Sequence, residues 1–70
     1  MAAVLDIKSC AACGAGHTLC HPDTDVLNPA RAYEYDCPAL GQTIRLPPSN
    51  AWNRVELFCP QGAVTLRDAS

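Results

Sequence analysis

Cysteine is the residue type that most constrains this chain, because five cysteines occur within only 70 residues. A chain of this length forms one domain, and its hydrophobic core alone supplies only about 3–5 kcal/mol of net stability. A disulfide, a bound metal ion or a partner subunit usually adds the rest, and abundant cysteine points to one of the first two. We therefore expect a single cysteine-stabilised domain over residues 1–70.

The N-terminal sequence MAAVLDIKSC bears on the choice between disulfides and metal. It has no basic segment ahead of a long apolar run, and Asp6 and Lys8 interrupt the hydrophobic stretch. This pattern is neither that of a signal peptide nor that of a membrane anchor, so we expect a cytoplasmic protein without membrane association, whose thiols stay reduced. An odd number of cysteines also leaves one unpaired in any disulfide scheme. Metal binding is therefore favoured over a disulfide framework.

The clearest strand pattern lies in the middle of the chain. In residues 33–37 both tyrosines and Cys37 share one face, while the two acidic residues take the other. The alternation of apolar and polar side chains resumes in residues 43–46, after the turn CPALG. We therefore expect a β-hairpin around this turn.

Two further hairpins follow from the same reasoning. One joins residues 5–8 to residues 16–19 through the turn CAACG, and another joins residues 54–59 to residues 64–67 through CPQG. The inward-facing positions of the last hairpin are expected to be Val55, Leu57 and Cys59. No helix longer than two turns is expected, because prolines and turn-forming residues fill the connections. The pattern predicts a small all-β fold with two or three β-hairpins around one structural metal site.

The strongest chemical signal is the sequence CAACG at residues 10–14. Two thiolates three positions apart on a tight turn, Cys10 and Cys13, can both reach one metal ion at about 2.3 Å from each sulfur. Gly14 can adopt the positive φ that such a turn often requires, which leaves backbone amides free to stabilise the charge on sulfur. We therefore expect both cysteines to bind metal.

Together, CAACG and CPALG resemble the paired knuckles of the zinc-ribbon family, in which CxxCG or CPxCG turns at the tips of β-hairpins hold zinc. The resemblance covers residues 7–46, and Pro38 and Gly41 match the second knuckle's frame. It implies a zinc-ribbon-like fold with zinc ligands Cys10, Cys13 and Cys37. Leu40, however, occupies the place of the second knuckle's other cysteine. The family pattern therefore leaves the site one ligand short.

Cys59 is our first choice for the missing ligand, since it follows a strand of similar alternation and precedes its own turn containing proline and glycine. Three rivals lie just past the first knuckle, namely His17, Cys20 and His21. A buried, unreactive cysteine is the alternative for Cys37 and Cys59, and a hydrogen bond to a thiolate or to the backbone is the alternative for His17. The expected ligand set is Cys10, Cys13, Cys37 and Cys59.

Zinc suits this donor set best. An all-thiolate tetrahedral site fits zinc or iron, but a rubredoxin-like iron site requires two complete knuckles, which Leu40 prevents. A filled four-sulfur shell leaves no position for a substrate water, and no carboxylate pair, nucleophile with a histidine base or glycine-rich phosphate loop stands out. A thiol redox role is least favoured, because the thioredoxin motif needs a βαβ context. We therefore expect a structural zinc site and no enzyme activity.

The charge pattern favours a protein partner. The formal net charge is −2, and the five basic residues form no contiguous patch, which disfavours the alternative of a nucleic-acid-binding zinc ribbon. Charged residues make up 17% of the chain, below the usual share of about 25%, so exposed apolar surface is expected. The expected docking surface comprises Val26, Trp52, Leu57 and Phe58, although Trp52 could instead complete the core. The sequence thus predicts a zinc-stabilised protein-interaction module.

Overall fold

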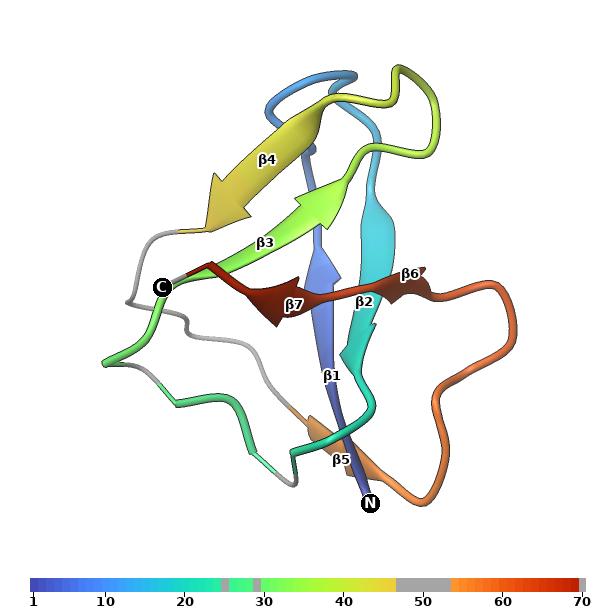
Figure 1. The fold of residues 1–70 in the computed structure, drawn as a ribbon. Coiled ribbons are helices and arrows are strands. Elements are labelled where there is room, and N and C mark those ends of the chain that lie inside the picture. Colours follow the sequence, from blue (N-terminus) through green and yellow to red (C-terminus); the bar gives the residue numbers. More distant parts are fainter. Residues whose placement is uncertain (25, 29, 47–53, 70) are drawn as a thin grey trace.

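The computed structural model describes residues 1–24, 26–28, 30–46 and 54–69. These residues form strands and turns without any helix, and none could therefore supply a membrane-crossing helix. The strands are β1 (Ala2–Ile7), β2 (His17–His21), β3 (Tyr33–Asp36), β4 (Thr43–Leu46), β5 (Arg54–Glu56), β6 (Val64–Thr65) and β7 (Arg67–Asp68), shown in Figure 1. The prediction of a small all-β fold is confirmed.

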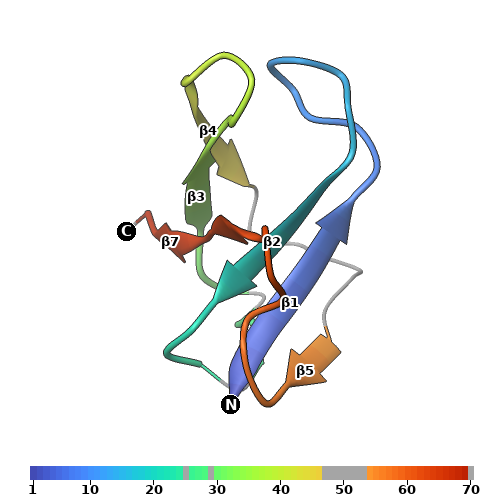
Figure 2. The same cartoon turned by 90° about the vertical axis from the view of Figure 1, so that its right-hand side faces the viewer.

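The strands form two sheets. One has the strand order β5-β1-β2-β6, and the other has the order β4-β3-β7. Two of the predicted hairpins are present: β1 pairs antiparallel with β2, from Ala3 opposite His21 to Ile7 opposite His17, and β3 pairs antiparallel with β4. In Figures 1 and 2 the two hairpins lie in separate layers, and their connecting turns come together at the same end of the molecule.

The main core lies between the two hairpins. As the alternation predicted, Tyr33 and Tyr35 of β3 point inward and are almost fully buried. They pack with the other buried members of the cluster, namely Ala3, Leu5, Cys10, Leu19, Leu27, Cys37 and Leu66. Burying each large apolar side chain contributes about 1.5–3 kcal/mol, so this small cluster is the main apolar source of stability.

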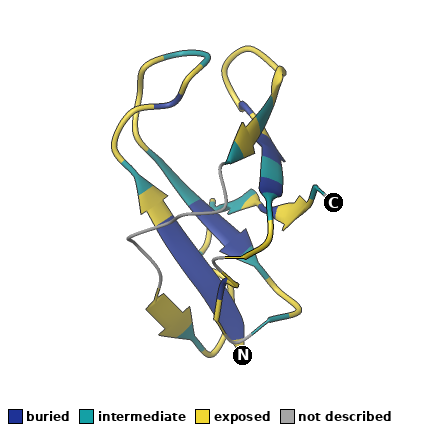
Figure 3. Cartoon of the chain, turned by 90° about the vertical axis from the view of Figure 1, so that its left-hand side faces the viewer, coloured by how far each residue is buried: buried dark blue, intermediate teal, exposed yellow. Residues whose placement is uncertain are grey.

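Strand β1 is buried on both of its faces, as its dark blue colour over most of its length shows in Figure 3. The face that points away from the main core carries Ala2 and Val4, which pack with Cys20 of β2 in a second, smaller cluster. Ala63, from the chain that precedes β6, packs against this cluster. The C-terminal part of the chain therefore covers the outer face of the first hairpin.

The predicted third hairpin does not form. Strand β5 pairs antiparallel with β1, β6 pairs parallel with β2, and β7 pairs antiparallel with β3. Val55 and Leu57, expected to point inward, are 39% and 71% exposed. The turn itself is present, since the amide of Ala63 donates to the carbonyl of Pro60 at 3.1 Å. After this turn the chain crosses the outer apolar face of β1 and β2. The free energy gained by covering this face is greater than that of pairing β5 with β6 locally.

Cys20 and Cys59 form a disulfide, which corrects the expectation that all the thiols are reduced. Their Cα atoms are 5.7 Å apart, within the range that a disulfide spans, although 39 positions separate them in the sequence. The crossing of the C-terminal chain over β2 brings them together. Disulfides are rare in cytosolic proteins, so this bond counts against the expected cytoplasmic location.

Candidate metal centre

The turn between β1 and β2 has the backbone geometry of a metal-binding knuckle. The amide of Gly14 donates to the carbonyl of Cys10 at 2.8 Å, and the amide of Cys10 donates to the carbonyl of Ala15 at 2.8 Å. Gly14 has a φ of 79°, a value that residues with a Cβ rarely adopt. The amide of Ala12 points at the sulfur of Cys10 at 3.4 Å. The turn thus places backbone donors around a thiolate, as the sequence predicted.

The turn between β3 and β4 repeats this geometry. The amide of Gly41 donates to the carbonyl of Cys37 at 2.7 Å, and the amide of Cys37 donates to the carbonyl of Gln42 at 2.8 Å. Gly41 has a φ of 72°. Leu40 stands where the first turn has its second cysteine, and its side chain is exposed. The second turn therefore provides one ligand where the first provides two.

The two turns bring four potential ligands together. One ligand atom from each of Cys10, Cys13, His17 and Cys37 lies within 4.8 Å of the other three. Two sulfurs bound to one tetrahedral zinc ion are about 3.8 Å apart, given Zn–S distances of about 2.3 Å. The cluster is thus close to the size that a single metal ion requires, and it joins side chains from both hairpins.

His17 occupies the position that the sequence analysis assigned to Cys59. It is the first residue of β2, and its Nε2 atom lies 3.3 Å from the sulfur of Cys13. Cys59 is instead bonded to Cys20, which removes both from the ligands that can reach this cluster. The prediction of Cys59 as the fourth ligand is wrong for this structure, and His17, considered as a rival, takes its place.

The sequence signal that favours His17 is its proximity to the first knuckle. His17 lies four positions after Cys13, and pairing of β1 with β2 sets it opposite Ile7, just beside the turn. His21 lies at the far end of the same strand and contacts Asp68 instead. Strand length therefore decides which of the two histidines reaches the cluster.

The cluster has a buried side and a more accessible side. Cys10 and Cys37 are only 3% and 1% exposed and belong to the main core, whereas Cys13 and His17 are half-buried. A metal ion here would be held between the core and the surface.

Tyr35 is the neighbouring residue that the sequence analysis did not connect with the site. Its hydroxyl group donates to the sulfur of Cys10 at 3.1 Å. Its ring also meets the ring of His17 edge to face, with centroids 6.2 Å apart and an interplanar angle of 66°. Its signal in the sequence was its place on the same strand face as Cys37, two positions away.

These contacts alter the ionisation of the thiols. The hydrogen bond from Tyr35 has the largest effect on the pKa of the Cys10 thiol. It outweighs burial, which raises this pKa, and the net result is a pKa lowered to about 6. The amide of Ala15 lowers the pKa of Cys13, but burial and the neighbouring thiols raise it, and the net shift is upward. Burial, followed by the contact with Cys10, raises the pKa of Tyr35. The site therefore favours thiolate at Cys10, while Tyr35 stays protonated as a hydrogen-bond donor.

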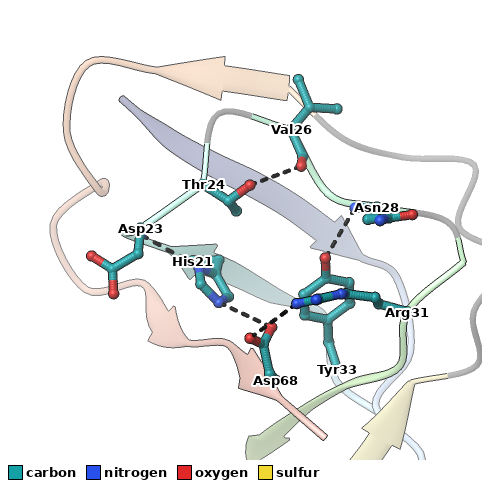
Figure 4. A pocket seen from close by; sticks show the side chains of 8 residues that line it. All are labelled: His21, Asp23, Thr24, Val26, Asn28, Arg31, Tyr33 and Asp68. Carbon is teal, nitrogen blue, oxygen red and sulfur yellow. Dashed lines mark hydrogen bonds and ion pairs between the residues drawn. The ribbon is translucent and has the colours of Figure 1, made fainter. Parts of the chain in front are cut away.

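A pocket of about 540 Å³ lies away from the cluster, between the chain that follows β2 and strand β7 (Figure 4). Its polar groups interact mainly with one another: Asp68 lies 3.4 Å from His21 and 3.6 Å from Arg31, and Tyr33 accepts from the amide of Asn28 at 2.9 Å. We see no nucleophile paired with a base among its lining residues. The contacts of Asp68 with His21 and Arg31 therefore connect this loop with the C-terminal strand.

Comparisons with protein-family models, curated proteins and solved structures find no significant match to this chain. The resemblance to zinc ribbons consequently stands on the two turns and the ligand cluster alone.

Proposed function

We propose that this protein is a structural zinc-binding domain of the zinc-ribbon kind that serves as a protein-interaction module. The observation that carries the proposal is the convergence of Cys10, Cys13, His17 and Cys37 within 4.8 Å of one another. Three thiolates and one imidazole form a common ligand set of structural zinc sites. The sulfur donors are soft ligands and therefore also favour zinc over magnesium, calcium or manganese.

The proposed role of the metal is to join the two hairpins. Cys10 and Cys13 belong to the turn after β1 and His17 begins β2, whereas Cys37 follows β3 on the other sheet. One ion bound by all four therefore fastens the layers at the end where their turns meet. With four protein ligands, no coordination position is left for a substrate water, so a structural role is favoured over hydrolysis.

Native mass spectrometry of the wild type and of two single variants tests this assignment. We expect one zinc ion per chain in the wild type, its loss or marked weakening in His17→Ala, and its retention in Cys59→Ser. A wild type that binds no zinc after refolding with the metal contradicts the proposal. Zinc loss in Cys59→Ser together with retention in His17→Ala would restore the ligand set expected from the sequence.

Exposed apolar side chains support the interaction role. Leu57 and Phe58 are adjacent in the chain that follows β5, and they are 71% and 80% exposed. Large exposed aromatic side chains are typical of interface hot spots. Val26 is also exposed, whereas Trp52 lies outside the described residues.

Affinity capture with Phe58→Ala tests the interaction role, with Leu40→Ala as the control for a second exposed apolar residue. We expect one dominant protein to be captured by the wild type and by Leu40→Ala, and to be lost with Phe58→Ala while zinc is retained. Capture unaffected by Phe58→Ala, or equally reduced in both variants, contradicts this surface.

Nucleic-acid binding is less well supported. Arg54 faces Asp6 and Glu56, and Arg67 faces two further carboxylates, so these guanidinium groups are already paired with acids. Binding to DNA or RNA that falls steeply with salt would favour this alternative over a protein partner.

A further inference from the structure

Among the residues that the structure describes, Tyr35 is the largest fully buried side chain, only 1% exposed, yet it carries a polar hydroxyl group. A buried hydroxyl without a partner is costly, so the identity of its partner is informative. The partner is the sulfur of Cys10, 3.1 Å away. The hydroxyl group, which is the only hydrogen-bond donor of the tyrosine side chain, thus donates to a proposed metal ligand.

The ring of the same residue approaches a second ligand. It packs edge to face against His17, the one nitrogen ligand of the cluster, with ring centroids 6.2 Å apart. Tyr35 of β3 also precedes Cys37 by two positions, and both side chains are buried in the main core. One buried residue therefore contacts two ligands and belongs to the same core cluster as a third.

We propose that Tyr35 is a positioning residue that retains the metal, through its hydroxyl on Cys10 and its ring on His17. This inference rests on the proposed zinc site. A metal-bound thiolate keeps lone pairs that accept hydrogen bonds, and such a bond stabilises the charged sulfur against protonation, the step by which a thiolate leaves a metal. Groups that orient metal ligands in this way typically change metal affinity by about 10–100-fold when they are mutated.

The chain provides a matched control in Tyr33. This tyrosine is also buried, lies on the same face of β3, and uses its hydroxyl to accept from the amide of Asn28 at 2.9 Å. Its ring meets a histidine edge to face as well, but that histidine is His21, which lies outside the cluster. Tyr33→Phe therefore removes the hydrogen-bonded hydroxyl of a second buried tyrosine without touching a ligand.

The experiment measures zinc transfer from the refolded full chain to an excess of a chromogenic chelator. We expect transfer about tenfold faster for Tyr35→Phe than for the wild type, because a hydrogen bond to a charged group is lost. Tyr33→Phe is expected to stay within about twofold of the wild type, since it makes no ligand contact. Equal rates in the wild type and Tyr35→Phe, or equal acceleration in both variants, overturn the inference.

Cobalt substitution supplies a readout that a purely structural defect does not mimic. A hydrogen bond to a thiolate lowers the energy of its lone pairs, so its removal should move the sulfur-to-cobalt charge-transfer band to longer wavelength. We expect this shift in Tyr35→Phe and an unchanged band in Tyr33→Phe. An unshifted band in a folded, cobalt-loaded Tyr35→Phe protein contradicts the role of the hydroxyl.

A second variant tests the inference even if Tyr35→Phe does not fold. Because the chain has only two tyrosines, 3-fluorotyrosine incorporated into Tyr33→Phe labels Tyr35 alone. The fluorinated phenol is a stronger donor of similar size, so zinc transfer should slow and the cobalt band should move to shorter wavelength. If neither the zinc-transfer rate nor the cobalt band changes, the inference is overturned. A wild type that binds neither metal instead overturns the proposed zinc site.

Discussion

Gly41 illustrates how one residue fixes the geometry of a ligand. Its φ of 72° closes the second turn around Cys37, and a Cβ built at this position would meet no atom within 4 Å. The cost of adding a side chain here is therefore conformational and not steric. This left-handed region costs a residue other than glycine about 1–2 kcal/mol, and asparagine less.

We accordingly expect Gly41→Ala to lower the free energy of unfolding by about 1–2 kcal/mol, and Gly41→Asn to lower it by less. Denaturant unfolding of the zinc-loaded variants checks this order. Equal losses for alanine and asparagine would show that the turn tolerates no side chain for another reason.

Asp36 is the residue whose ionisation predicts a dependence of stability on pH. Arg67 of β7 hydrogen-bonds its carboxylate at 3.1 Å and is the main reason that the pKa of Asp36 is lowered, with Thr43 contributing as well. A lowered folded-state pKa means that the stabilisation is present above the unfolded pKa of about 4, and is lost as the pH falls through the folded pKa.

We expect Arg67→Ala to melt slightly below the wild type at neutral pH, and the two melting temperatures to converge as the pH falls through the lowered pKa of Asp36. The effect is small because both side chains are about half-exposed and solvent screens the pair. Thermal melts of metal-free protein across this range measure the difference. A constant difference at every pH would assign the effect of Arg67 to packing.

The turns CAACG and CPALG form a pair of equivalent elements, in which Leu40 of the second turn stands where the first has Cys13. Because their backbone hydrogen bonds correspond, a cysteine at position 40 should occupy the same place as Cys13 in the first turn. We expect Leu40→Cys to restore zinc binding to His17→Ala, since it completes a second pair of thiolates.

Zinc stoichiometry and affinity of the double variant check this rescue. Ala39→Cys in the same background is the matched control, because it places a thiol one position away on the same turn and should not restore binding. Rescue by both cysteines, or by neither, contradicts the equivalence of the two turns.

The Cys20–Cys59 disulfide ties strand β2 to the chain that follows β5, across 39 positions of sequence. Closing a loop of this length restricts the unfolded chain and typically contributes about 2–4 kcal/mol. We expect the double variant Cys20→Ala, Cys59→Ala to lose about this much unfolding free energy in the zinc-loaded state while it keeps its metal. Denaturant unfolding with a parallel metal assay measures both properties. Loss of zinc from this variant would show that the two sites depend on each other.

At the scale of the whole molecule, two cross-links act at different places. The proposed metal lies where the turns meet, at the end opposite β5 in Figure 1, whereas the disulfide attaches the C-terminal chain to the outer face of the first hairpin. Removing the metal should therefore loosen one end of the protein first. This follows because metal binding and folding are coupled at the site that holds the ligands together.

Hydrogen exchange before and after chelation measures this asymmetry. We expect the amides of Gly14 and Gly41 to exchange much faster without zinc, whereas the amide of Leu66, which donates to the carbonyl of Cys20, keeps more of its protection. Uniform loss of protection would mean that the metal holds the entire fold. Unchanged exchange at both glycines would mean that the metal stabilises neither turn.

The sequence by itself determined the local parts of this protein. The spacing of Cys10, Cys13 and Gly14 specified the first knuckle, and the alternation around Tyr33 and Tyr35 specified the strand that leads to the second. These features were predictable because a hairpin and its turn are set by neighbouring residues, through side-chain alternation and the φ that glycine permits. The cysteines of both turns were therefore assigned correctly to one cluster.

Only the tertiary structure decided the fourth member of the cluster and the course of the C-terminal chain. Cys59 carried the same local signals as Cys37, yet it meets Cys20 because residues 57–63 cross the second apolar face of β1. His17 then completes the cluster from the start of β2. Those outcomes depend on which surfaces remain to be buried once the hairpins have formed, and that competition between distant segments leaves no periodic trace in the sequence.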